Sequence, residues 1–433
     1  MNTDNYFESY TFSVIGLGYV GLELALSLSN AGFDTIGFDL NEKRISQLKK
    51  NQDSNLEKSS KELSQSSLKF TSDKNKLDNS THFFLAIPTP VDLNNEPDLK
   101  PLIRACELVG EIMKKGSTII IESTVFPGVT EEICIPIIEK CSGLRLGQHF
   151  KVAYSPERIN PGDKINIIDQ VSKIVSASDE ETLMEIKQIY GKFVCKEIIT
   201  VSSIKIAEAA KLIENVQRDL NIALMNEFST ILDSNNIPTN EVLDAASSKW
   251  NFHNYRPGLV GGHCVSVDPY YLSHFAKKSG MLSKLILTAR DVNDRMVDFL
   301  VGKILEQIKI NKFQKTKCKI GILGVSFKEN VSDLRNSKVL VLAEKLKAHG
   351  LICELCDPLV SSSGYQNKHG YELANFERLR ELDAMLLAVP HDVFLDMGIE
   401  SLTTPLKQNG VFLDFKSRFA KVSKPQNIKY WCL

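Results

Sequence analysis

The sequence has no apolar run near the ~20 residues that a membrane-spanning helix needs. Its first residues, "MNTDNYFESY", lack the basic segment and apolar run of a secretory signal peptide. It also lacks an excess of one charge, because the formal net charge of its 433 residues is -1. Such a balance gives no reason to expect nucleic acid or an acidic membrane surface as a partner. We therefore expect a cytoplasmic protein that binds neither.

A regular cysteine framework is missing as well. The nine cysteines are odd in number and irregularly spaced, which argues against a disulfide network. The one CxxC pair, Cys353 and Cys356, falls in an expected strand, where residues three apart point to opposite faces. No second pair completes a zinc site. Both are expected to be small core residues, and no metal site is predicted.

The length and pattern of the chain indicate several domains. With 43% apolar and 24% charged residues, 433 residues suit a globular protein of two or three domains. Strands and helices alternate through the first 200 residues, as in a parallel sheet with helices on both faces. Residues 202–236 form one expected helix, with apolar positions every three or four residues and neither Gly nor Pro.

The last part of the chain repeats the first at low resolution, with a strand, a glycine turn, a helix and a strand ending in an acid. We therefore predict an α/β fold of two Rossmann-like doubly wound domains joined by a long central helix. The expected domains are residues 1–200, 201–310 and 311–433. The long helix is also a candidate surface for a homodimer.

A GxGxxG motif follows the first expected strand and opens a helix. Such a triplet alone is weak evidence, but Asp39 ends the next strand about 20 residues on, as in a dinucleotide-binding fingerprint. Gly16 allows the tight turn, Gly18 lets a pyrophosphate approach, and Gly21 lets the helix pack closely on the strand. Asp39 would accept hydrogen bonds from the ribose hydroxyls and repel a 2′-phosphate, so we predict NAD rather than NADP. The motif's predicted cofactor-binding residues are Gly16, Gly18, Tyr19, Val20, Gly21 and Asp39.

One cysteine, Cys264, lies just after Gly261 and Gly262 and just before Asp268. Glycines let a backbone run close to a neighbour that a Cβ would push away. Beside a nicotinamide cofactor, a thiol can add to an aldehyde, and the adduct loses a hydride to become a thioester that water hydrolyses. The alternative for Cys264 is a buried small residue. Asp268 is a candidate to take a proton from water or substrate.

Lys211 and Asn215 lie one turn apart on the long expected helix, hence on the same face. An ammonium and an amide there could stabilise a developing oxyanion. The alternative for Lys211 is a solvated helix lysine, which the spacing alone favours.

Seven segments, in this order, carry a resemblance to a known family: "GLGYVG", "AIPTP", "ESTVFPGVTEE", "YSPERINPGD", "IAEAAKLIENVQRDLNIALMNE", "GLVGGHCVSVDPYYL" and "GILGVSFKENVSDLRNSKV". In them the chain resembles the UDP-glucose/GDP-mannose dehydrogenase family over essentially its full length. "YSPERINPGD" and "RPGLVGGHC" look most like the bacterial branch that acts on UDP-N-acetylglucosamine or UDP-N-acetylgalactosamine. One departure is the polar run at residues 51–67, where relatives often have a glycine-marked turn; we expect a surface loop and helix there.

The resemblance implies an N-terminal NAD domain, a C-terminal UDP-sugar domain and dimers paired through the long helix. It implies a four-electron oxidation of the sugar C6 hydroxymethyl group to a carboxylate with two NAD, for surface polysaccharide. Two other substrates, UDP-glucose and GDP-mannose, stay open. So do a single-step hydroxyacid dehydrogenase, which has no use for Cys264, and a regulator that binds NAD or UDP-sugar without turnover.

The resemblance also implies roles for individual residues. Cys264 would be the covalent nucleophile, and the other implied catalytic residues are Lys211, Asn215, Asp268, Thr124 and Glu157. Further implied cofactor contacts are Arg44, Thr89, Thr124 (or Glu122 in its place) and Arg335. The implied substrate contacts are Glu157, Arg158, Lys211, Asn215, Arg256, Gly261 and Lys328, with Lys416 and Arg418 as candidates for the nucleotide end.

Overall fold

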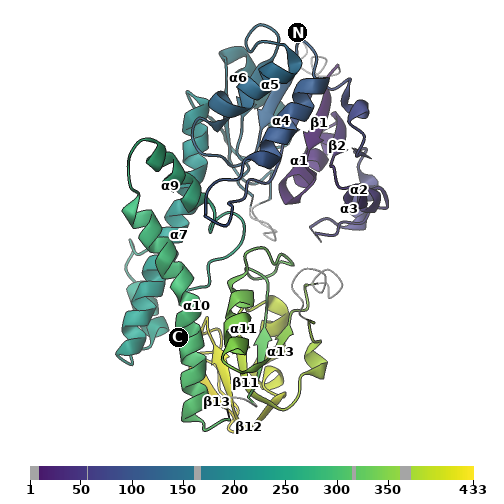
Figure 1. The fold of residues 1–433 in the computed structure, drawn as a ribbon. Coiled ribbons are helices and arrows are strands. Elements are labelled where there is room, and N and C mark those ends of the chain that lie inside the picture. Colours follow the sequence, from purple (N-terminus) through teal and green to yellow (C-terminus); the bar gives the residue numbers. More distant parts are fainter. Residues whose placement is uncertain (1–8, 56, 160–166, 315–317, 361–371) are drawn as a thin grey trace. The chain divides into compact units, whose positions relative to one another are not determined.

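The computed structural model describes residues 9–55, 57–159, 167–314, 318–360 and 372–433 (Figure 1). They form two compact units: unit 1 holds the described residues within 1–214 and 270–282, and unit 2 holds those within 215–269 and 283–433. None of the helices in the described ranges has the length and apolar content that crossing a bilayer requires.

Unit 1 is built on an eight-stranded sheet in the order β3-β2-β1-β4-β5-β6-β7-β8. Its strands are β1 Thr11–Ile15, β2 Asp34–Phe38, β3 Lys69–Thr71, β4 His82–Leu85, β5 Thr118–Ile121, β6 Lys151–Tyr154, β7 Lys173–Ala177 and β8 Ile198–Thr200. Its helices are α1 Tyr19–Asn30, α2 Glu42–Lys49, α3 Ser60–Gln65, α4 Lys100–Ile112, α5 Ile135–Ser142 and α6 Glu180–Tyr190, with short turns Lys74–Leu77 and Thr130–Cys134.

The central strands are short apolar runs, and β4 and β5 are buried throughout, as expected where helices cover both faces. On one face, apolar side chains of α1 and α6 pack with Phe12, Phe84 and Ile120 of the sheet. The helix α4 contacts β4 and packs against α5. Burial on both sides explains why these strands lack a polar alternation.

One strand pair departs from the parallel sheet that the sequence predicts. The strands β6 and β7 run antiparallel, with Tyr154 opposite Ser176, while the other neighbours in unit 1 are parallel. The described part of the connection between them holds no helix to carry the chain across the sheet. As a result, β7 begins at the edge where β6 ends. This reversal brings Lys173 to the carboxyl edge of the sheet.

Unit 2 contains a five-stranded parallel sheet in the order β10-β9-β11-β12-β13. Its strands are β9 Lys319–Leu323, β10 Ile352–Cys356, β11 Leu382–Leu387, β12 Leu406–Asp414 and β13 Lys429–Cys432. Apolar side chains of α10 (Lys284–Ile310) and α11 (Lys338–Ala348) cover one face, and those of α13 (Asp392–Leu402) pack on the other. The two-sided packing confirms the second doubly wound domain. The turn Phe376–Arg378 precedes β11, and α8 (Thr239–Ala246) lies earlier in the unit.

The long expected helix is α7, Ile204–Ser234, which begins in unit 1 and continues in unit 2. Within unit 2 it is joined to α10 by buried polar groups. Arg290 Nη1 lies 2.6 Å from Asp219 Oδ1, and Asn293 donates to the same oxygen at 2.7 Å. The Asn226 side-chain amide donates to Asn293 Oδ1. It also donates to the Gly258 carbonyl at 3.0 Å and accepts the Gly258 backbone amide at 2.8 Å. The start of the loop that leads to Cys264 is therefore fixed from the helix pair.

Two smaller predictions, on the polar run and on the CxxC pair, are also confirmed. The polar run holds α3, which begins with a capping box between Ser59 and Glu62. The CxxC pair lies in β10, where Cys353 packs against one core and Cys356 belongs to the other. In the described ranges, no group of three or more His, Cys, Asp or Glu side chains is arranged to hold a metal ion.

Candidate active site

The glycine motif forms the turn that the sequence predicts. Gly16 has a φ of 91°, which glycine adopts readily, and follows β1 at the carboxyl edge of the sheet. A Cβ on Gly21 would lie 1.7 Å from the Gly16 carbonyl oxygen, whereas a Cβ on Gly18 would meet nothing within 4 Å. Gly21 is thus required for packing, and the space above Gly18 is open. The amides that begin α1 have no side-chain cap there, which suits a pyrophosphate.

Asp39 follows β2 directly beside this turn, since Ile15 and Phe38 are partners in the register. Its carboxylate accepts the Leu17 amide at 2.9 Å and the Asn41 amide at 2.8 Å, one on each oxygen. These bonds hold the carboxylate in place and leave lone pairs for ribose hydroxyls. The open turn, the helix start and the fixed acid together fit NAD.

Arg44 is placed differently from a direct cofactor contact. It is 7% exposed, and its Nε donates to the Leu17 carbonyl at 3.0 Å while Nη1 binds Asp53 at 2.6 Å. The guanidinium therefore stabilises the glycine turn through its hydrogen bond to the Leu17 carbonyl. A contact between Arg44 and the cofactor stays a prediction.

We expect Asp39→Ala to raise the KM for NAD about tenfold or more, because hydrogen bonds to a charged acceptor are worth about 1.5–3 kcal/mol. The same change should narrow the preference for NAD over NADP, since the repelling charge is gone. Initial rates with both cofactors measure this. Asp34→Ala is the matched control, because Asp34 begins the same strand in an exposed pair with Lys69. An unchanged KM for NAD in Asp39→Ala would contradict the assignment.

The next two loops along the carboxyl edge are tied to each other. The Thr89 hydroxyl donates to the Thr124 carbonyl at 2.7 Å, and the Ile87 amide donates to the Ser123 hydroxyl at 2.9 Å. Thr89 and Thr124 thus lie together beside the glycine turn, as β1, β4 and β5 are neighbours in register. The sequence places both in the cofactor site, and the structure brings them to one edge.

Glu157 follows β6 at this edge and is 6% exposed. Its Oε1 accepts the amides of Arg158 and Ile159 at 2.6 and 2.8 Å, and its Oε2 lies 2.7 Å from Lys173 Nζ. The same ammonium binds Glu122 Oε2 at 2.7 Å. Sequence reasoning missed Lys173, although a lysine that begins a buried apolar strand, "KIVSA", needs a counter-charge.

Arg158 is engaged within unit 1. Its Nη2 lies 2.7 Å from Glu214 Oε1 on α7, and its Nη1 donates to the Ser172 carbonyl at 2.8 Å. It fixes the loop after β6 to the long helix, and its predicted contact with substrate stays a prediction.

On α7, Lys211 and Asn215 are both buried, at 7% and 5% exposed. The alternative of a solvated Lys211 is therefore wrong. Within unit 2, the Asn215 amide donates to Asp268 Oδ2 at 2.5 Å, and Asp268 is 3% exposed. The structure thus brings together two of the residues that the resemblance assigns to catalysis. Asp268 begins α9, Asp268–Lys278.

The glycines before Cys264 run against protein rather than open space. A Cβ on Gly261 would lie 2.6 Å from the Asn336 carbonyl oxygen, and one on Gly262 would lie 2.8 Å from the Phe327 ring. Gly262 has a φ of 84°, and its carbonyl accepts the Asn336 amide at 2.9 Å and the Ser266 hydroxyl at 2.7 Å. The glycines therefore allow the cysteine loop to pack on the segments that follow β9. This contact leaves a role for Gly261 in substrate binding as a prediction.

Cys264 itself is half-buried, and its carbonyl accepts the amides of Val267 and Asp268 at 2.9 and 2.8 Å. By contrast, burial raises the pKa of Cys318 and of Cys356 to about 12, as expected of inert core thiols. Cys264 is thus more exposed than these two core thiols, and its role as a nucleophile stays a prediction.

Unit 2 has a small basic hollow after β9. Its lining includes the lysines Lys328, Lys338 and Lys416 and the hydroxyl residues Ser326 and Ser337. Ammonium groups and hydroxyls are donors that suit phosphate oxygens. Lys338 and Lys416 also have acidic partners, Asp294 at 2.7 Å and Glu329 at 2.5 Å. Two lysines that the resemblance assigns to the nucleotide, Lys328 and Lys416, therefore line one hollow.

Two predicted arginines have acidic partners inside unit 2. Arg335 donates to Asp333, with Nη2 to Oδ2 at 2.6 Å, and Arg256 binds Asp244 at 2.8 Å. Both are partly exposed, and their predicted roles stay predictions.

The acid that ends β10 differs from its counterpart in unit 1. Asp357 is 5% exposed and accepts the amides of Val325, Ser326 and Leu359 at 2.8 to 3.1 Å. It also lies 3.1 Å from His391 Nε2. Burial and four protein partners therefore distinguish Asp357 from Asp39, which is partly exposed and accepts one amide on each oxygen.

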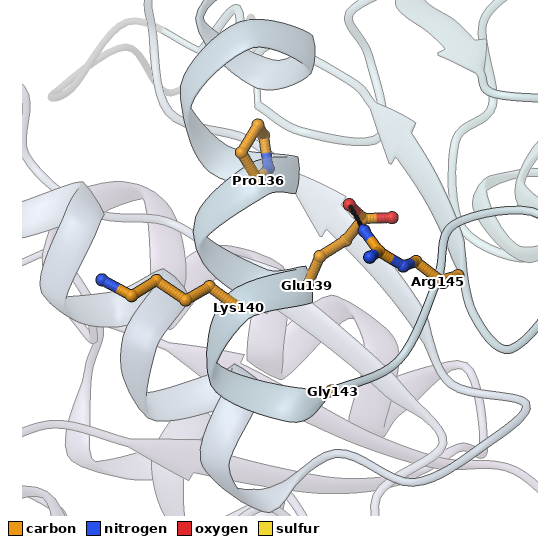
Figure 2. Close-up of a pocket in the computed structure, with 5 residues that line it drawn as sticks. All are labelled: Pro136, Glu139, Lys140, Gly143 and Arg145. Atoms are coloured by element: carbon orange, nitrogen blue, oxygen red, sulfur yellow. Dashed lines mark hydrogen bonds and ion pairs between the residues drawn. The ribbon is translucent and has the colours of Figure 1, made fainter.

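A surface hollow of about 380 Å³ lies at the C-terminal end of α5 (Figure 2). Arg145 reaches back to Glu139 at 3.0 Å, while Lys140 points away from the pair. The hollow is lined by Pro136, Glu139, Lys140, Gly143 and Arg145, none of which is a predicted site residue.

Known proteins resemble this chain over most of its length. The UDP-glucose/GDP-mannose dehydrogenase family profile matches in three parts: the NAD binding domain at residues 10–194, the central domain at 205–295 and the UDP binding domain at 321–421. Protein CapL of Staphylococcus aureus is 42% identical over 404 residues, covering 93% of this chain and 95% of its own. UDP-N-acetyl-D-glucosamine 6-dehydrogenase of Pseudomonas aeruginosa is 41% identical over 405 residues, covering 93% and 96%.

Among solved structures, the UDP-D-ManNAc dehydrogenase of Pyrococcus horikoshii superposes with a TM-score of 0.86 at 29% identity, covering 97% of this chain and 98% of its own. These matches confirm the resemblance, the fold and NAD as the cofactor.

Proposed function

Because the chain belongs to the UDP-glucose/GDP-mannose dehydrogenase family and is an NAD-dependent nucleotide-sugar dehydrogenase, we propose that it oxidises the C6 hydroxymethyl group of UDP-N-acetylglucosamine to a carboxylate. Relatives that carry this activity in their names are 40% and 41% identical over nearly the whole chain. The observation that carries the mechanism is the half-buried Cys264 on a loop fixed by Gly258, Gly261 and Gly262.

The proposed reaction removes two hydrides from one carbon. Bound NAD supplies the hydride acceptor for each oxidation. After the first, the Cys264 thiolate adds to the aldehyde carbon, giving a thiohemiacetal, and loss of the second hydride leaves a thioester on Cys264. Water then attacks the thioester carbonyl, which releases the carboxylate and restores the thiol. One sugar alcohol, two NAD and one water thus become one carboxylate, two NADH and three protons.

The side chains divide the work by their chemistry. Lys211 and Asn215 stabilise the oxyanions, as an ammonium and an amide donor can. Asp268, which binds the Asn215 amide, and Glu157 are the carboxylates that take protons, and Thr124 helps to position water. Lys328 and Lys416, in the basic hollow of unit 2, contact the diphosphate.

The three-part division predicted from the sequence fits this chemistry, with NAD in residues 1–200, the catalytic loop in 201–310 and the UDP-sugar in 311–433. We place the homodimer surface on α7, whose exposed apolar residues recur at spacings that return to one face of a helix. They are Ile206, Ile213, Leu224, Phe228 and Ile231. A sedimentation mass equal to one chain, 48.5 kDa, would refute the pairing.

UDP-N-acetylmannosamine is the second candidate substrate. The Pyrococcus horikoshii enzyme that carries this name is 32% identical over 90% of this chain. The sequence identity of this chain to the two UDP-N-acetyl-D-glucosamine 6-dehydrogenases is higher, so UDP-N-acetylglucosamine remains the first candidate substrate. Surface polysaccharide synthesis is the proposed use of the acid.

The deciding experiment counts NADH released per sugar consumed. The sugars are the UDP-linked N-acetyl derivatives of glucosamine, galactosamine and mannosamine, with UDP-glucose and GDP-mannose. We expect two NADH per UDP-N-acetylglucosamine, together with the uronic acid by mass spectrometry. A yield of one NADH indicates a single-step dehydrogenase, and none with any sugar favours a binding protein without turnover.

A further inference from the structure

Unit 1 contains a buried cluster of ionisable side chains that the proposed reaction uses only in part. Its members are Glu122 after β5, Glu157 after β6, Lys173 at the start of β7 and Tyr190 at the end of α6. The side chains of Glu122, Glu157 and Lys173 are 0%, 5% and 2% exposed. Buried ion pairs contribute little net stability, so this cluster is a candidate for a role in the reaction.

The geometry makes Lys173 a bridge between two carboxylates. Its Nζ lies 2.7 Å from Glu122 Oε2 and 2.7 Å from Glu157 Oε2. The Tyr190 hydroxyl donates to the other oxygen of Glu122, and its ring centroid lies 5.1 Å from the ammonium. A continuous hydrogen-bonded chain therefore runs from Glu157 through Lys173 to Glu122.

The charges of this cluster do not cancel. Two ionised carboxylates and one ammonium carry a net charge of minus one, so uptake of one proton makes the cluster neutral. The two carboxylates compete unequally for that proton. Glu157 accepts two backbone amides, which stabilise its ionised form, whereas Glu122 has the Tyr190 phenol in their place.

The acidities agree with this asymmetry. Burial raises the pKa of Glu122 to about 7, against the opposing charge of Lys173. Burial also acts on Glu157, but the charge of Lys173 and the two amides bring its pKa below the ordinary value. Glu122 is thus the carboxyl group that changes charge near neutral pH.

Other charged groups near the cluster have partners of their own. Glu23 faces Glu157 from α1 and lies 2.5 Å from Lys58, so this pair adds no net charge. Ser155, after β6, faces the Tyr190 hydroxyl. The titration near neutral pH therefore belongs to Glu122 within its contacts to Lys173, Glu157 and Tyr190.

We propose that Glu122 is the terminal acceptor for the proton that Glu157 takes during thioester hydrolysis, with Lys173 as the positioning residue that connects them. This inference rests on the proposed function. When Glu157 takes a proton from water, Lys173 gives one ammonium proton to Glu122 and receives the proton from Glu157. Glu157 is thereby ionised again, Lys173 keeps its charge, and the proton lies on Glu122 until it passes to solvent. The cluster accepts this proton only while Glu122 is ionised.

Two nearly isosteric substitutions in the full-length protein test the proposal, and neither removes the ammonium from between the carboxylates. For the wild type, we expect kcat to rise with pH through an inflection near 7 as Glu122 ionises. In Glu122→Gln this inflection should disappear and kcat at pH 8 should fall about tenfold, with KM for the sugar unchanged because the Glu122 side chain is fully buried. In Tyr190→Phe the inflection should move up by about one pH unit, since the ionised carboxylate loses a hydrogen bond.

A second readout needs no turnover. The folded pKa of Glu122 lies above its unfolded value, so the folded state binds more protons between about pH 4.5 and 7. The free energy of unfolding should therefore fall as pH rises through this window. In Glu122→Gln it should fall less, because the contribution from the titration of Glu122 is missing. Urea titrations of both proteins across the window measure the difference.

The outcomes separate the two proposals. Wild-type protein that releases no NADH from any sugar refutes the proposed function, while the unfolding titrations still show whether Glu122 holds the proton. An active Glu122→Gln that keeps the inflection near pH 7 overturns the relay. The relay is also overturned if Glu122→Gln changes the pH dependence of the unfolding free energy but keeps the wild-type pH profile of kcat. The proton held by Glu122 would then have no part in the reaction. A merely structural role would change the unfolding free energy and leave the pH profile in place.

Discussion

Cys264→Ala should lower the rate of uronic acid formation at least about 10³-fold, because no other step of the proposed reaction supplies the thioester. The first oxidation needs no thiol, so the product should stop at the aldehyde and NADH should not exceed one per sugar. Quench analysis by mass spectrometry, with NADH followed by absorbance, measures both quantities. The variant should fold like the wild type, because the Cys264 side chain is only half-buried and the loop is held by backbone hydrogen bonds.

The matched control is Cys141→Ala, an exposed cysteine at the end of α5 that should leave both rates unchanged. UDP-sugar binding by calorimetry should be alike in both variants. Full acid production by Cys264→Ala would show that the covalent mechanism is wrong.

Arg290→Met should lower the free energy of unfolding by about 3–5 kcal/mol, the cost of leaving a buried charge without its partner. In this variant the fully buried Asp219 loses its ion pair with Arg290 and keeps its hydrogen bond from the Asn293 amide. Burial already raises the pKa of Asp219, so in the variant this carboxyl should take a proton more readily. The loss of unfolding free energy in Arg290→Met should therefore become smaller as pH falls, because a protonated, neutral Asp219 does not need a cation beside it.

Arg295→Met on the same helix is the control, since Arg295 pairs with Asp291 at the surface and should matter by about 1 kcal/mol or less. Urea unfolding at two pH values tests both. Equal losses in the two variants would contradict the structural role of the buried pair.

The sequence predicts most of the fold because its signals are local. The GxGxxG turn, the acid after the second strand and the three-to-four periodicity of α7 each depend on neighbouring residues. The antiparallel β7 could not be predicted, because strand direction depends on a connection whose composition carries no directional signal. That reversal brings Lys173 to Glu157, so the error in topology and the missed residue have one cause.

The site was predicted less completely. Spacing placed Lys211 and Asn215 on one face, but only the structure shows that Asn215 binds Asp268, because the loop that ends at Asp268 returns to the helix through tertiary packing. The glycines before Cys264 suggested a close approach, which the structure assigns to Phe327 and Asn336. Sequence position alone does not reveal which partner a glycine accommodates.

The protein-held carboxylate of Asp357 has a consequence for the order of events. Asp357 is buried, and three backbone amides and His391 bind its oxygens, so the second doubly wound domain does not offer a ribose the partly exposed carboxylate that Asp39 offers in the first. A reaction that removes two hydrides with one such fingerprint must reload its cofactor midway, while the half-oxidised sugar stays in place. In the proposed reaction, the bond to Cys264 would then serve as a tether as well as a chemical intermediate, and it would keep a reactive aldehyde from escaping during the exchange.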